Sequence, residues 1–143
     1  MLSRRQLLAA AGAGAGVGAL GVGVDRTIHR GTVFEKWIRG WDGEGPELVH
    51  SVVIDSSGTP YVPETDEELF DTASGRRPVA TDEVHAHLGD RYDRVEYGLN
   101  VCVADVRRDC RGGTASREAF NAVQVTDEVT AAVAADRVRL LRP

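Results

Sequence analysis

The feature that most constrains the fold of this chain is a strict alternation of apolar and polar residues between Arg94 and Val106. One set of alternate positions is apolar and holds Val95, Tyr97, Leu99, Val101 and Val103. The intervening set holds Glu96, Gly98, Asn100, Cys102 and Ala104. Because successive side chains of a strand point to opposite faces, this period of two predicts a long β-strand. One face should lie in the core and the other toward solvent or a partner.

Shorter segments rich in β-branched and aromatic residues predict further strands at 30–38, 48–54, 59–62, 127–135 and 137–140. The segment 59–62 belongs at a sheet edge, because Pro60 and Pro63 lack the N–H that a central strand needs. Residues 127–135 also fit a capped helix, and we favour the strand. Composition predicts loops or turns at 40–46, 55–58 and 112–113.

Three N-terminal capping signals predict short helices. Thr65 and Glu68 form a capping-box pattern, and that helix should end before Gly75. The sequence Thr81-Asp82-Glu83 begins a second helix, which Gly89 should end, and Ser116 caps a single helical turn. The acidic pairs at 67–68 and 82–83 fall at helix starts, where the helix dipole favours them, so we do not interpret them as an acid–base pair.

A chain of 143 residues has room for one small domain. These patterns together predict a mainly β fold with two or three short helices, and an α+β fold is the alternative. The chain carries 17 basic and 22 acidic residues, a formal charge of −5. That balance argues against a general nucleic-acid binder. Lys36 is the only lysine beside sixteen arginines, and this acid-shifted composition resembles that of salt-loving archaea.

The N-terminus contains Arg4 and Arg5, followed by 18 uncharged residues rich in glycine and alanine. This segment resembles a twin-arginine translocation (Tat) signal. The resemblance implies that residues 1–24 are an export signal handled by the Tat machinery and that residues 25–143 form one exported domain. The apolar segment 7–24 would span about 27 Å as a helix, so a retained membrane anchor competes with cleavage near Gly23. We expect the membrane to be contacted only through this segment, and the domain to be extracellular or at the cell surface.

Two further patches carry a second resemblance. The Gly-Thr-Val sequence 31–33 with Lys36, together with the segment 116–129, is similar to a small uncharacterised β domain of prokaryotic surface and membrane proteins. The resemblance implies a small, strongly bent sheet or partial barrel, with an insertion near 40–90. It offers no catalytic residues. Thr126 stands where that pattern has glycine, which is a departure at an expected tight turn.

Cys102 and Cys110 are the only two cysteines. An exported chain with an even number of cysteines favours a disulfide, and two free buried thiols are the alternative. In a hairpin with its turn at 105–107, these residues face each other directly, within disulfide reach. Because Cys102 falls on the polar face of its strand, we expect a surface bridge outside the apolar core.

The spacing of His85 and His87 is the one pattern typical of a metal site, with Asp82, Glu83 and Asp90 nearby. Residues two apart share a face on a strand but lie about 200° apart around a helix. Because the capping signals favour a helix here, we do not favour the metal site.

Trp37 and Trp41 flank Arg39 and fit either a binding patch or large core side chains, of which we favour the core.

No catalytic motif and no cofactor fingerprint is present in the sequence. We therefore expect a non-enzymatic interaction or structural module with an unidentified protein partner and no cofactor. The alternatives are a metal-binding protein that uses His85 and His87, and an exported hydrolase whose site the sequence does not reveal.

Overall fold

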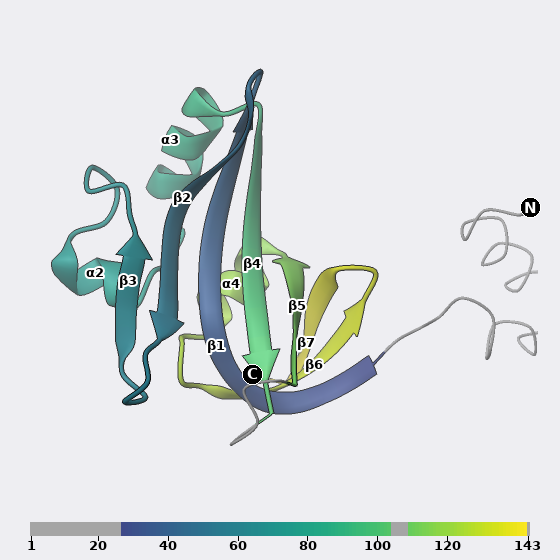
Figure 1. The fold of residues 1–143 in the computed structure, drawn as a ribbon. Helices are drawn as coiled ribbons and strands as arrows, with labels where there is room; N and C mark the ends of the chain where they lie inside the picture. The colour runs from purple at the N-terminus through teal and green to yellow at the C-terminus, as the bar shows by residue number, and fades with distance from the viewer. Residues whose placement is uncertain (1–26, 104–108, 143) are drawn as a thin grey trace, which may run out of the picture.

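The computed structural model describes residues 27–103 and 109–142, which form a seven-stranded mixed sheet with three short helices (Figure 1). The elements in chain order are β1 (Thr27–Asp42), β2 (Gly45–Ile54), β3 (Pro60–Glu64), α2 (Thr72–Arg76), α3 (Asp82–Arg91), β4 (Arg94–Cys102), β5 (Cys110–Ala115), α4 (Arg117–Ala122), β6 (Glu128–Ala134) and β7 (Arg137–Arg142). The predicted mainly β fold is therefore confirmed.

The long strand β1 organises the sheet. The strand order is β3-β2-β1-β4-β5-β7-β6, and β1 also pairs with β6. The second half of β1 pairs with β2 and β4, and its first six residues pair with β6. In Figure 1, β1 runs through the middle of the sheet and then curves beneath it toward β6. This bend closes a partial ring of five strands, as expected for a strongly bent sheet.

The segment 40–46 is not the loop that its composition predicts. β1 continues to Asp42 and β2 begins at Gly45, so that Trp41 pairs with Pro46 across a tight hairpin. The Glu44 N–H donates to Asp42 Oδ1 at 2.7 Å, which closes the turn. Of the three glycines in this segment, Gly43 lies in the two-residue hairpin turn, whereas Gly40 and Gly45 lie in the strands.

The predicted helix after Thr65 is also wrong. Residues 65–70 form a turn, and the helix is α2, whose capping box is made by Asp71 and Ser74. Thr65 Oγ1 lies 2.9 Å from His50 Nδ1 instead of capping a helix. Phe70 is buried and stacks on the His50 ring, so tertiary packing competes successfully with the local capping signal.

Two glycines do not end or turn the chain as predicted. The helix α3 has the predicted N-cap at Thr81, but it passes Gly89 and ends at Arg91. The pair Gly112-Gly113 lies inside β5 and forms no turn. Three other expectations are confirmed: Ser116 caps α4, the segment 127–135 is largely the strand β6, and 59–62 overlaps the edge strand β3.

The core lies between the inner face of the sheet and the helices. Its largest fully buried apolar side chains include Ile38, Leu88, Leu99 and Phe120. The opposite face of β4 is covered as well, because Trp37 of β1 lies over Gly98, where a Cβ atom would clash with the indole ring. The alternation along β4 is therefore present, but its second face is not fully open to solvent.

The turn before β6 contains a left-handed residue. Thr126 has φ of 87°, and the Asp127 N–H donates to Gln124 O at 3.0 Å. A β-branched residue is strained in this region, which glycine adopts freely. The expected tight turn is thus present, with threonine at the position where the resembling pattern has glycine.

Candidate functional site

The predicted disulfide joins β4 to β5. Cys102 and Cys110 face each other in the strand register, with their Cα atoms 4.0 Å apart. The predicted turn at 105–107 lies outside the described residues. The expectation of a surface bridge is wrong, because Cys102 is only 3% exposed. β1 crosses closely there, with Gly31 against the Cys102 carbonyl, where a side chain would clash.

Among residues 27–103 and 109–142, Lys36 is the one lysine or arginine that is buried, and it is 0% exposed. Its Nζ donates to the carbonyl oxygens of Pro78 and Val123, both at 2.8 Å, and to Gln124 Oε1 at 3.2 Å. The ammonium also lies 4.0 Å from the centre of the Phe120 ring. Lys36 thus ties β1 to the connector before α3 and to the segment after α4.

Burial lowers the pKa of Lys36 to about 7, although the negative charge of Asp127 raises it. The charge of Arg77 lowers it further. A lysine held by three acceptors in the core could have been suspected from the sequence, because position 36 shares a strand face with Ile38. In the sequence, Lys36 stands out only as part of the family resemblance.

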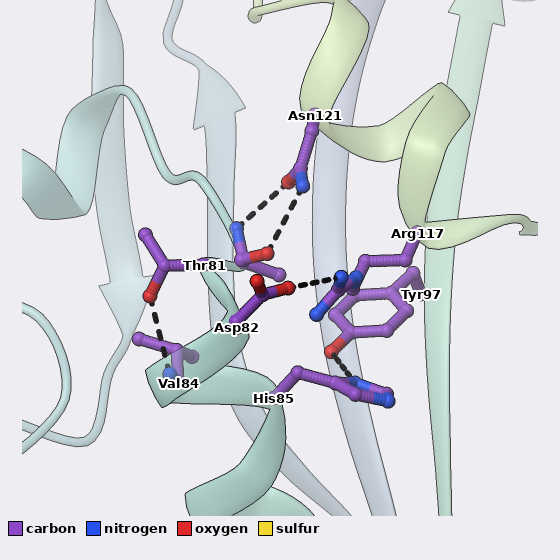
Figure 2. A network of polar contacts seen from close by, with 8 residues as sticks. Thr81, Asp82, Val84, His85, Tyr97, Arg117 and Asn121 are labelled. Atoms are coloured by element: carbon purple, nitrogen blue, oxygen red, sulfur yellow. Dashed lines mark hydrogen bonds and ion pairs between the residues drawn. The ribbon is translucent and has the colours of Figure 1, made fainter.

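A second set of polar contacts holds α4 against the start of α3 (Figure 2). The Asn121 side chain accepts from the Ala80 N–H at 2.7 Å and donates to the Ala80 carbonyl at 3.0 Å. Arg117 of α4 forms an ion pair with Asp82 at 2.6 Å. Asp82 is almost fully exposed, so we expect this pair to add little stability.

His85 of α3 meets Tyr97 of β4 within the same network (Figure 2). The His85 Nδ1 atom lies 2.6 Å from the Tyr97 hydroxyl. Burial raises the pKa of Tyr97 to about 12, while the charge of Arg117 lowers it. The phenol is therefore protonated at neutral pH and can donate its hydrogen to His85 Nδ1.

The helix α3 places His85 and His87 on one helix, two residues apart, so one ion cannot bind both rings. Within residues 27–103 and 109–142, no group of three or more histidine, cysteine, aspartate or glutamate side chains is arranged to hold a metal. The Ser116 hydroxyl accepts from the Ala119 N–H, so Ser116, which also lines the groove described next, serves as a helix cap.

A groove of about 1180 Å³ opens beside the His85–Tyr97 pair, and we call it the arginine groove. It lies between the beginning of β4, the end of β5 with α4, and the pair β6–β7. Its lining residues are His85, Arg94, Val95, Glu96, Tyr97, Thr114, Ala115, Ser116, Arg117, Glu118, Ala119, Ala122, Ala132, Ala134, Arg137, Val138, Arg139 and Leu140.

Positive charge prevails in the arginine groove, although the whole chain is acidic. Four arginines line it against two glutamates. Arg117 is paired with Asp82, and Arg94 lies 3.5 Å from Glu96. Arg137 and Arg139 are exposed, and neither has an ion-pair partner among the described residues. The groove therefore presents two free guanidinium groups, which are suited to bind carboxylates.

The two tryptophans lie on the outer face of the sheet, each beneath a guanidinium group. Arg39 lies 4.6 Å from the centre of the Trp37 ring, and Arg94 lies 4.2 Å from that of Trp41. Trp37 is buried and Trp41 is half-buried. We expected core side chains, and neither tryptophan belongs to the main apolar cluster.

In the part of the chain that the structure describes, no helix is long and apolar enough to cross a bilayer. Arg4 and Arg5, which the sequence predicts to be part of an export signal, and the apolar segment 7–24 lie outside the described residues. No protein-family model, curated protein or solved structure matches this chain.

Proposed function

We propose that this chain is a Tat-exported, non-enzymatic module that binds an acidic segment of a partner protein in the arginine groove at the cell surface or outside the cell. One observation carries the proposal: Arg137 and Arg139 are exposed on one rim of a large groove, and neither has an ion-pair partner in the part of the chain that the structure describes. Unpaired guanidinium groups beside a recess favour anionic partners, and charge complementarity gives such contacts their specificity.

The disulfide supports the extracellular part of the proposal. Bridges of this kind persist in oxidising compartments and are rare in the cytoplasm. Cys102 and Cys110 connect neighbouring strands of the sheet that forms the groove. An exported protein would keep this bridge and with it the register of β4 and β5.

Export is tested by replacing Arg4 and Arg5 with lysine in the full chain, produced in a host with a Tat system. The double variant should remain in the cytoplasmic fraction, whereas a matched Arg26→Lys variant should be exported normally. Immunoblots of cell fractions measure the outcome. Export of the double variant at the normal yield would refute the Tat assignment.

Binding is tested with fluorescent polyglutamate and polylysine and the purified full chain at low salt. Polyglutamate should bind, and its affinity should fall as salt rises, because screening weakens exposed charge contacts. Polylysine should not bind. If polyglutamate does not bind, or if the double variant Arg137→Ser/Arg139→Ser binds it as well as the unmodified chain, the groove is not the proposed site.

A further inference from the structure

The strand β5 ends before its two neighbours do. Its last residue, Ala115, pairs with Tyr97, so residues 94–96 of β4 have no β5 partner. β7 pairs with β5 at one position only, Thr114 with Arg137. Residues 138–142 of β7 thus pair with β6 on one side alone. Two strand edges face the same gap, and the arginine groove is that gap.

The width of the gap follows from the sheet. Neighbouring strands lie about 4.8 Å apart, so β4 and β7 are roughly two spacings apart where β5 lies between them. Beyond Ala115 the chain leaves the sheet at Ser116 and enters α4. Ala119 and Ala122 of α4 line the groove, and their small side chains leave room above the helix. The space between β4 and β7 beyond Ala115 therefore has the width of one strand.

We propose that the arginine groove binds an extended acidic segment of a partner protein as an added β-strand between β4 and β7. This inference rests on the proposed function and specifies how the partner is held. Main-chain groups of the segment pair with the open edges of residues 94–96 and 138–141, the mode of recognition used when a peptide extends a sheet. Closing these edges also removes exposed strand edges that would otherwise favour aggregation.

The register of the neighbouring strands predicts the side-chain pattern of the segment. β5 runs antiparallel to β4, where Ala115 faces Tyr97, and parallel to β7, where Thr114 faces Arg137. If the line of β5 continued by one residue beyond Ala115, that position would therefore lie between Glu96 and Arg139. The position after that falls between Val95 and Leu140, which are partly buried against the core. The bound segment should therefore alternate acidic residues toward Arg139 with apolar residues toward Val95 and Leu140.

A nucleic acid fits this site less well than a peptide. Bases need aromatic surfaces or wide clefts. Val95, Val138 and Leu140 make one wall of the groove aliphatic, and of its two aromatic residues Tyr97 is buried, which leaves only the His85 ring exposed. The groove is also about one strand wide. We therefore commit to a peptide and include an oligonucleotide in the test.

The test uses fluorescence anisotropy with the purified full chain and a labelled eight-residue peptide that alternates valine and glutamate. One control peptide has the same residues in two blocks, and another is N-methylated at alternate amides, which removes the donors needed for strand pairing. Oligothymidine of similar length is the third probe. The protein variants are Arg139→Glu in the groove and Arg76→Glu in α2, a charge reversal of an exposed arginine outside the groove.

The alternating peptide should bind at least tenfold more tightly than the block peptide or the N-methylated peptide. Arg139→Glu should weaken its binding by at least tenfold, and Arg76→Glu should leave it unchanged. Amide hydrogen exchange of residues 138–141 should slow when the peptide is bound.

Equal binding of the normal and N-methylated peptides would overturn strand addition while leaving the acidic partner in place. Tighter binding of oligothymidine than of any peptide would overturn both proposals. Failure of every acidic probe would refute the proposed function itself.

Discussion

Replacing Lys36 by methionine tests whether a single buried ammonium sets the pH dependence of this fold. Methionine keeps most of the side-chain volume and removes the charge and the donors. The Val123 carbonyl then loses the Lys36 donor that lies 2.8 Å away. The Pro78 carbonyl loses the same donor at 2.8 Å and keeps only the Gln124 amide at 3.3 Å. A buried acceptor left unpaired is unfavourable by about 1–3 kcal/mol, so the variant should be less stable by roughly that amount at pH 9.

The pH dependence has a definite sign. The pKa of Lys36 falls from 10.5 in the unfolded chain to about 7 in the folded one. Between these values the unfolded state binds more protons, so stability rises with pH, by up to about 1.4 kcal/mol per unit. From pH 7 to pH 9 the gain is about 2 kcal/mol. Because this is the only lysine, no other ε-amine titrates in that window.

The assay is urea unfolding at pH 7, 8 and 9 for the unmodified chain, Lys36→Met and the matched control Arg30→Met, an exposed residue of the same strand. The unmodified chain and the control should gain stability with pH relative to Lys36→Met. Amine-reactive labelling followed by mass spectrometry should leave Lys36 unmodified until the chain is unfolded. Parallel pH profiles for all three proteins, or rapid labelling of folded Lys36, would refute the reasoning.

Three further predictions concern other parts of the fold. Thr126→Gly should raise the free energy of unfolding by about 1 kcal/mol, because glycine adopts the positive φ of 87° without strain; a loss of stability would contradict the strained turn. Reducing the bridge between Cys102 and Cys110 should lower stability by at most about 2.6 kcal/mol for a nine-residue loop and leave the circular dichroism of the sheet intact, and unfolding on reduction would show a larger role. Substituting both His85 and His87 by glutamine should leave the effect of zinc on Tm unchanged, and a zinc-dependent rise found only in the unmodified chain would restore the metal site.

Local patterns predicted many of the elements. The alternation between Arg94 and Val106 predicted β4, because the pleat of a strand imposes a period of two whatever lies around it. The caps at Thr81 and Ser116 predicted the starts of α3 and α4, since a side chain that accepts from a nearby N–H acts within one turn. The pairing of Cys102 with Cys110 also followed from short spacing within one hairpin.

The candidate site was decided by contacts between distant segments. The partners of Lys36 lie 42 to 88 positions away, and none of them is marked by a local pattern. The arginine groove exists because β5 ends before β4 and β7, which depends on how β1 bends and brings β6 into the ring. The helix predicted after Thr65 failed for the same reason, since burying Phe70 against His50 outweighs a capping signal of about 1 kcal/mol. Local preferences in a sequence contribute free energies of this size. The burial of large side chains stabilises the fold by more, and it depends on residues that only the folded chain brings together.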